Sequence, residues 1–238
     1  LVFGETSHWD PNWLHTTEEY YRLCIPRILE AVFLALDREP RRVFSIESLF
    51  FLQRYWQSNP VQHERLRDLV NQRRLRLTGT GITTPDTVLP DTEAILRDYA
   101  DGQQWLAANG MTVEPRLAYL PDDFGHSPAL PTLLVALGFD MAAITRIDGM
   151  YFIGSDYRKK SAFPLPGSSA ELLAKQLKTA DFVWRGPDGS QVLCHWNAFT
   201  YFQGDLLAHV GVVRGMDRIY GFPCRTEAQL GRASCKEK

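Results

Sequence analysis

The segment His8-Trp9-Asp10 combines an imidazole and a carboxylate at a spacing of two residues. On an extended chain, residues i and i+2 point to the same side, so His8 and Asp10 can present a nitrogen and an oxygen side by side. This donor pair suits a zinc ion. The same spacing also arises by chance on protein surfaces, and an ordinary polar pair is the alternative interpretation.

A second segment of interest begins with the adjacent carboxylates Asp122-Asp123 and continues as Phe124-Gly125-His126-Ser127. It lies between a β-like run at residues 117–120 and a helical run that begins near Pro128. Two neighbouring carboxylates in a strand-to-helix loop are costly unless a cation or a buried role compensates them, which points to metal binding or catalysis. The alternative is an ordinary turn in which Asp123 faces solvent or caps the following helix.

The elements that must position these segments alternate between short β-like runs and helical runs. This order is typical of an α/β protein with a mostly parallel sheet, in which ligands bind at the carboxyl ends of the strands. After Asp205 the pattern fades, and neither a linker nor an internal repeat divides the chain. We expect strands at residues 1–8, 43–46, 75–78, 117–120 and 141–145, helices at 16–36, 49–57, 64–74, 91–110 and 130–137, and a hairpin at 182–194.

The composition is that of an ordinary globular protein. Of the 238 residues, 45% are hydrophobic and 23% are charged, and the formal net charge is −2. A chain of this length can bury roughly 70% of its unfolded surface, so it builds a core without disulfide or metal staples. Its charge gives no long-range attraction to nucleic acid or to an anionic membrane, and its apolar runs are too short to cross a bilayer. We expect neither nucleic acid nor a membrane as a partner.

The cysteines and the chain ends carry weaker signals. Cys24, Cys194, Cys224 and Cys235 form no C-x-x-C pair, and the chain has no N-glycosylation sequon. We therefore expect free thiols and favour a cytoplasmic location. The chain starts at Leu1, inside a β-like run, and its last residues lack the pattern of a domain end, so we expect a truncated domain.

Taken in order, two segments resemble glycoside hydrolase family 38, the retaining α-mannosidases. They are His8-Trp9-Asp10-Pro11-Asn12-Trp13 and Asp122-Asp123-Phe124-Gly125-His126-Ser127, which match the family's H-x-D-x-x-W and D-x-F-G-H-S motifs. Stretches at residues 18–21, 44–51, 102–106 and 138–146 agree, and the resemblance runs to residue 202. It implies a seven-stranded (β/α) barrel, incomplete in this chain, with residues 1–238 forming part of the family's N-terminal catalytic domain.

The resemblance also implies a reaction and a metal. His8, Asp10 and Asp122 would bind Zn²⁺, and Asp122 would attack the anomeric carbon of a mannose-containing glycan to form a covalent glycosyl-enzyme. The fourth metal ligand, a histidine, and the general acid, an aspartate, would lie beyond this chain. Asp123 occupies a position that the family often fills with proline, so its side chain would have no particular role.

Four further residues match substrate-binding positions of the family. Trp13 would stack under the sugar and Phe124 would pack beside it, although plain core packing is the alternative for both rings. Arg146 would keep the nucleophile ionised, and Tyr201, or its neighbour Phe202, would contact sugar hydroxyls.

Two other functions stay open. A metal-dependent polysaccharide deacetylase would need a His-x-x-x-His pair, whereas His126 is followed by Ser-Pro-Ala-Leu-Pro. A truncated carbohydrate-binding module would keep Trp13 and Phe124 without the general acid.

His195 is better explained as a hydrogen-bonded structural residue than as a metal ligand. The sequence does not identify the glycosidic linkage that is cleaved. A homo-oligomer is compatible with it.

Overall fold

A computed structural model describes residues 6–150, 164–198 and 201, which form two compact units. The first unit contains the described residues 6–77 and 102–113, and the second contains 78–101, 114–150, 164–198 and 201. The chain passes between the units several times, and one of these boundaries falls inside a helix.

The first unit opens with two consecutive helices, α1 (Thr17–Leu23) and α2 (Ile25–Arg38). Thr16 and Glu19 form the capping box that starts α1: the Thr16 hydroxyl accepts the Glu19 N–H at 3.3 Å, and the Glu19 carboxylate accepts the Thr16 N–H at 2.9 Å. A single helix over residues 16–36 was expected, and this expectation is wrong. The break falls at Cys24, and Pro26 is in the first turn of α2, where a residue without an N–H is tolerated.

A short parallel sheet follows in the same unit. Strand β1 (Phe44–Ile46) pairs with β2 (Leu75–Leu77) in parallel, with Phe44 opposite Leu75. Thr6 adds a parallel bridge to Ser45, and the Ser7 N–H donates to the Ser45 carbonyl at 3.0 Å. The connection between β1 and β2 contains α3 (Phe50–Ser58), the short 3-10 helix η1 (Pro60–Gln62) and α4 (His63–Asn71).

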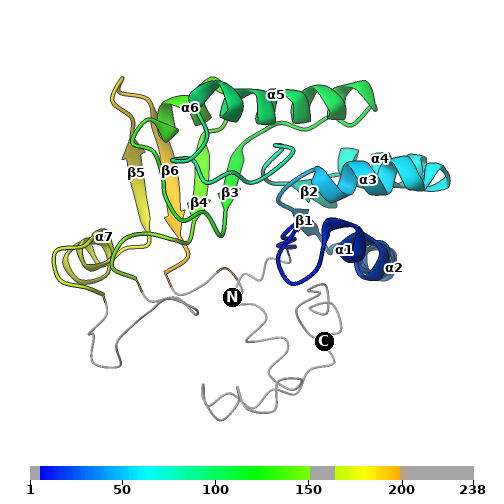
Figure 1. Ribbon diagram of the computed structural model, residues 1–238, viewed down its shortest axis with the longest axis horizontal. Helices are drawn as coiled ribbons and strands as arrows, with labels where there is room; N and C mark the ends of the chain where they lie inside the picture. The colour runs from blue at the N-terminus through cyan, green and yellow to red at the C-terminus, as the bar shows by residue number, and fades with distance from the viewer. Residues whose placement is uncertain (1–5, 151–163, 199–200, 202–238) are drawn as a thin grey trace, which may run out of the picture. The chain divides into compact units, whose positions relative to one another are not determined.

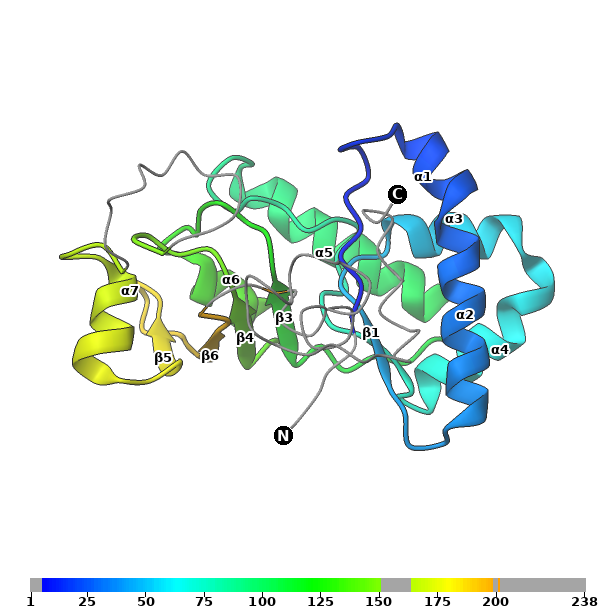
Figure 2. The same ribbon diagram turned by 90° about the horizontal axis from the view of Figure 1, so that it is seen from below.

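The core of the first unit lies between these helices and strands. α2 contacts α3 and α4 contacts β2, and Figures 1 and 2 show the three helices grouped beside β1. Buried positions of α2 recur every three or four residues, as a one-sided helix requires. Phe33 of α2 meets Tyr55 of α3 edge-on, with ring centroids 6.1 Å apart. Fully buried side chains here include Leu29, Phe33, Leu36, Ile46, Leu52, Tyr55, Leu66 and Leu75.

The second unit contains a four-stranded sheet of order β3-β4-β6-β5. Its strands are β3 (Leu117–Leu120), β4 (Met141–Ile144), β5 (Asp181–Arg185) and β6 (Gln191–Trp196). β3, β4 and β6 are parallel, and β5 pairs antiparallel with β6 as the hairpin that the Gly-Pro-Asp-Gly-Ser turn predicts. Parallel pairing was expected for most of the chain, and this expectation is confirmed.

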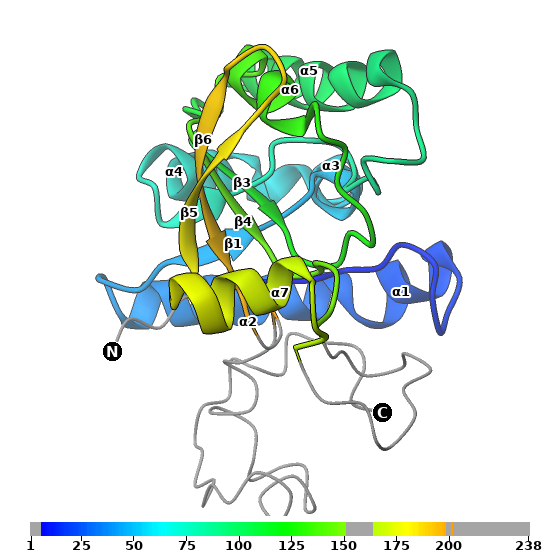
Figure 3. The ribbon, with the colours of Figure 1, turned by 90° about the vertical axis from the view of Figure 1, so that its left-hand side faces the viewer.

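Helices cover the buried face of this sheet. α5 (Thr92–Ala108) begins in the second unit and continues into the first, α6 (Leu130–Ala136) contacts both β5 and β6 (Figure 3), and α7 (Ser169–Glu171) leads into a π-helical turn, η2 (Leu172–Leu177). Asp91 starts α5 by accepting the Ala94 N–H at 2.8 Å. The core formed by α5, α6 and the sheet contains Ile95, Tyr99, Ala118, Leu120, Leu130, Leu134, Ala142, Ile144, Val192 and Cys194.

The cysteine expectation holds only in part. Cys194 is a free, buried thiol, and burial raises its pKa to about 12, so it is protonated at neutral pH. Cys24 is disulfide-bonded, so the expectation of a free thiol is wrong there. Cys224 and Cys235 lie outside the described residues, as do most of the first expected strand and the region after Asp205.

The fold is therefore a mixed α/β fold. Within the described residues, the strands form one two-stranded and one four-stranded sheet, and neither is closed on itself. The seven-stranded barrel stays a prediction. No helix in the described part of the chain is long and apolar enough to cross a membrane.

Candidate functional site

In the first unit, the chain that follows the Thr6 bridge brings His8 and Asp10 together. Nε2 of His8 lies 3.2 Å from Oδ1 of Asp10, and their side chains are 13% and 29% exposed. The same-side placement predicted from the spacing of two residues is confirmed. The pair is accessible at the surface without being fully solvated.

The other imidazole nitrogen of His8 contacts Glu47, a residue of the matching stretch 44–51 to which the sequence analysis assigned no role. Nδ1 of His8 lies 2.9 Å from Oε1 of Glu47, and the same oxygen accepts the Trp9 N–H at 3.1 Å. Glu47 directly follows β1 and is only 3% exposed. The sequence signal that could have identified Glu47 is its place directly after a buried strand, because a buried carboxylate needs a hydrogen-bonding or charged partner.

The His8–Asp10 pair fits a zinc ion on chemical grounds. A neutral His8 ring that donates an Nδ1 proton to Glu47 would carry its lone pair on Nε2, toward Asp10. Two ligands that are each about 2.0–2.2 Å from one zinc ion in tetrahedral geometry lie about 3.3–3.6 Å apart. The observed separation of 3.2 Å is close to this range.

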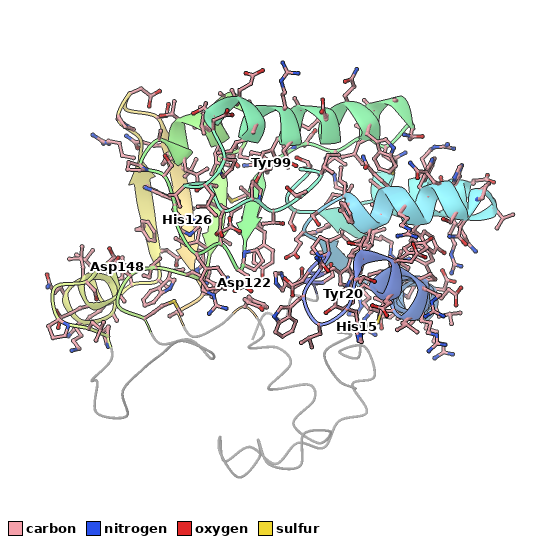
Figure 4. The ribbon with its side chains drawn as sticks, viewed as in Figure 1. His15, Tyr20, Tyr99, Asp122, His126 and Asp148 are labelled. Atoms are coloured by element: carbon pink, nitrogen blue, oxygen red, sulfur yellow. The ribbon has the colours of Figure 1, made fainter. Side chains whose placement is uncertain are left out.

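In the second unit, Asp122 follows β3 and Arg146 follows β4. Nε of Arg146 donates to Oδ1 of Asp122 at 2.7 Å, and Nη2 donates to the same oxygen. The Tyr201 hydroxyl lies 3.4 Å from Oδ2 of Asp122. The side chains of Arg146 and Asp122 are 11% and 20% exposed. Figure 4 shows Asp122 just beyond the arrowhead ends of the strands.

Aromatic rings surround this ion pair. The guanidinium carbon of Arg146 is 5.2 Å from the Phe124 ring centroid and 5.7 Å from that of Tyr201. Phe124 is 61% exposed, and Trp13, in the first unit, is 57% exposed. Plain core packing is therefore wrong for both rings. Exposed aromatic faces are suitable for contacting a ring-shaped ligand.

Asp123 differs from the sequence expectation. It is only 3% exposed, and Ala129, not Asp123, precedes α6 as its N-cap, so the expectation that Asp123 faces solvent or caps the helix is wrong. Burial raises the pKa of Tyr99, and the nearby negative charge of Asp123 adds to this effect. Asp122 and Asp123 both lie in the bent segment that follows β3, and of the two only Asp123 is buried there.

The loop that carries Phe124 is held by a second loop of the same unit. The Thr87 hydroxyl donates to the Gly125 carbonyl at 3.2 Å and accepts the Ser127 N–H at 3.1 Å. Asp86 accepts the Phe124 N–H. The segment 86–88 therefore fixes the backbone on both sides of Gly125.

Two histidines of the second unit have structural contacts. Nε2 of His126 lies 3.1 Å from the Arg146 carbonyl, and burial lowers the pKa of His126, so the ring is neutral and donates this hydrogen bond. Nδ1 of His195 lies 2.8 Å from the Asp181 carboxylate across the hairpin. This is the structural role that was expected for His195.

Comparison with known proteins identifies the family. The sequence profile described as the glycosyl hydrolases family 38 N-terminal domain matches residues 4–214. The chain therefore belongs to glycosyl hydrolase family 38, and residues 4–214 match its N-terminal domain.

Individual relatives agree with this assignment. The alpha-mannosidase 2 of Homo sapiens is 29% identical over 198 residues, which cover 81% of this chain and 16% of that protein. The alpha-mannosidase 2 of Arabidopsis thaliana is 33% identical over 141 residues, covering 59% of this chain and 12% of that protein. The matched region is thus a small part of these relatives.

Solved structures show a similar fold. An alpha-mannosidase from Enterococcus faecalis V583 superposes with a TM-score of 0.64 at 22% identity, covering 91% of this chain and 22% of that one. A 4-alpha-glucanotransferase from Thermococcus litoralis superposes with a TM-score of 0.53 at 16% identity. The match covers 82% of this chain and 27% of the glucanotransferase chain.

Proposed function

We propose that this chain is part of an α-mannosidase that cleaves α-mannosidic bonds with retention of configuration, and that Asp122 is its nucleophile. The observation that carries the proposal is the Asp122 carboxylate, held by Arg146 at the D-x-F-G-H-S position of the family 38 motif. Family membership supports the reaction class. The two 29–33% identical relatives are both alpha-mannosidases by name.

Nucleophilic attack on the anomeric carbon requires an ionised carboxylate at residue 122. A carboxylate oxygen of Asp122 bonds to the anomeric carbon while the bond from that carbon to the leaving oxygen breaks, and the leaving oxygen takes a proton from a general acid. Water then hydrolyses the glycosyl ester and releases Asp122. The guanidinium of Arg146 favours the anionic form of Asp122 before attack, since an opposite charge at contact stabilises the charged state.

We further propose that His8, Asp10 and Asp122 would hold a zinc ion. The support is the donor chemistry of each half: an imidazole nitrogen beside a carboxylate oxygen in the first unit, and a carboxylate anchored by Arg146 in the second. When bound, Zn²⁺ would supply Lewis-acid stabilisation and orient hydroxyls of the sugar. The protein's own part is to keep the three ligands in place and Asp122 ionised.

The substrate class follows from the same residues. We propose a glycan with a terminal mannose, whose apolar ring face would lie on Trp13 or Phe124 and whose hydroxyls would contact Tyr201. In the second unit, the exposed Phe124 ring beside the polar groups of Asp122, Arg146 and Tyr201 supports this proposal.

The test is to trap the covalent intermediate in the full natural polypeptide that contains these residues. A fluorinated α-mannosyl substrate forms the glycosyl-enzyme quickly and releases it slowly, and peptide mapping then identifies the labelled residue. We expect the label on Asp122 and none in Asp122→Asn. Label on another residue, or a product of inverted configuration, would contradict the proposal. Binding of mannosides without hydrolysis would favour a carbohydrate-binding module instead.

A further inference from the structure

We propose that Glu47 is a positioning residue for His8: it holds the proton of the imidazole on Nδ1 and thereby aims the Nε2 lone pair at the metal. This inference rests on the zinc site proposed above and extends it by a residue that does not touch the metal. It concerns only contacts within the first unit.

Glu47 is anchored by the strand before it. Ile46, the last residue of β1, pairs with Leu77 and is 1% exposed, so the backbone leading into Glu47 is fixed. The Glu47 side chain is 3% exposed. A carboxylate buried to this extent is costly unless hydrogen bonds or charges compensate it, so its contacts identify its role.

Both observed contacts of Glu47 lead to the His8 segment. Oε1 is 2.9 Å from Nδ1 of His8 and accepts the N–H of Trp9 at 3.1 Å. The Trp9 ring is buried and lies edge-on to Phe51, with centroids 6.4 Å apart. One carboxylate oxygen thus fixes both the ring of His8 and the backbone of the next residue.

The other carboxylate oxygen of Glu47, Oε2, is buried and makes no hydrogen bond to a further residue that the structure describes. Glu47 is therefore not one member of a wider polar cluster in this part of the chain. Orienting the His8 segment accounts for its position.

The consequence for His8 is a choice of tautomer. A neutral imidazole has one N–H and one lone pair, and an anionic acceptor at Nδ1 favours the proton there. Nε2, 3.2 Å from Asp10, then keeps its lone pair on the side of the second ligand. Carboxylates that orient metal-binding histidines in this way raise metal affinity about 10–100-fold.

The deciding experiment measures zinc affinity in the full natural polypeptide after removal of metal, by competition with a chromophoric chelator. Glu47→Gln keeps an acceptor for the Trp9 N–H and removes the charge, so we expect the zinc Kd to rise roughly 10–100-fold. Glu47→Asp keeps the charge on a shorter side chain and should recover part of the affinity. The unfolding midpoint of each metal-free protein is measured alongside.

The matched control is Asp181→Asn. It removes a carboxylate that is 2.8 Å from Nδ1 of another histidine, His195, on the exposed hairpin. Its zinc Kd should equal that of the wild type. A purely structural role of Glu47 would lower the metal-free unfolding midpoint of Glu47→Gln and leave the Kd of the folded protein unchanged.

The outcomes separate the two proposals. If the wild type binds zinc and Glu47→Gln binds it within threefold, on the order of the scatter expected for a neutral change, the role of Glu47 is wrong and the metal site stands. If the wild type binds zinc no better than His8→Ala, the metal site itself is wrong, and the inference falls with it. Should Glu47→Gln fail to fold, the tautomer of His8 in the metal-free wild type decides, read from the 15N NMR shifts of its ring: a ring proton on Nε2 and none on Nδ1 would overturn the inference.

Discussion

Asp122 and Arg146 occupy equivalent positions on neighbouring parallel strands. Leu120 of β3 pairs with Ile144 of β4, and each strand is followed two residues later by one member of the ion pair. The register of the sheet therefore brings the guanidinium to the carboxylate. A shift of this register by one residue would separate them, because successive side chains alternate between faces.

This relationship makes Arg146→Lys an informative substitution. Lysine keeps the positive charge but cannot donate two hydrogen bonds to one carboxylate in a fixed plane. We expect kcat on an aryl α-mannoside to fall about 10²–10³-fold, the usual loss when one preorganised donor is removed. Arg116→Lys, at an exposed ion pair with Asp140, is the control and should change nothing measurable. Equal activity of Arg146→Lys and the wild type would contradict the assigned role.

The buried position of Asp123 separates its effect from that of Asp122. Asp122→Asn should lower kcat by several orders of magnitude, since an amide cannot form the glycosyl ester. Asp123→Asn should instead lower the free energy of unfolding by about 1–3 kcal/mol, the range for disturbing a buried polar group, and change kcat of the folded protein less than about tenfold. Urea unfolding and steady-state kinetics distinguish the two variants. A large loss of kcat in Asp123→Asn with little loss in Asp122→Asn would make Asp123 the nucleophile.

His126 predicts a pH-dependent stability. Burial lowers its pKa below the ordinary value of 6.5, so the unfolded chain binds a proton more readily than the folded one. Its contribution to the free energy of unfolding is therefore complete above about pH 6.5 and is lost as the pH falls toward the folded-state pKa. Urea unfolding at several pH values should show a shallower acid slope for His126→Gln than for the wild type. Identical slopes would mean that His126 does not titrate differently in the two states.

Gly125 predicts a steric effect on the aromatic loop. A Cβ added there would lie 2.6 Å from Cγ2 of Val88, and the backbone on either side is fixed by Thr87. Gly125→Ala should therefore cost about 1–3 kcal/mol in overpacking and raise KM by displacing Phe124. Adding Val88→Ala, a half-exposed position, should restore both values. A double variant no better than Gly125→Ala would show that Val88 is not the cause.

Local signals predicted much of the fold. The capping box at Thr16, the Asp91 cap and the β3 and β4 runs all depend on residues close in sequence, and each of these elements begins where it was expected. Gly138, with φ of +92°, follows α6 as the helix stop signal predicts. These features need no knowledge of distant contacts.

The break of the first helix at Cys24 has a local cause beside Pro26, whereas the misjudged roles of Asp123 and Glu47 depend on distant contacts. Asp123 is buried in a bent loop near Tyr99, a residue of α5 that is distant in sequence. Glu47 matters because it meets His8, which is far away in sequence. No periodicity at Glu47 or Asp123 encodes such a partner. The family resemblance named the ligands that we propose and included Glu47 in its matching stretch 44–51 without giving it a role.

The order of the four-stranded sheet has a consequence for synthesis of the protein. β4 and β6 are neighbours, yet the segment 145–190 separates them along the chain. On the ribosome, β3 and β4 therefore emerge well before β6, and the β6-facing edge of β4 has unpaired backbone groups during that interval. An open edge of this kind pairs readily with other chains, so slow translation between the two strands would favour aggregation of the nascent polypeptide.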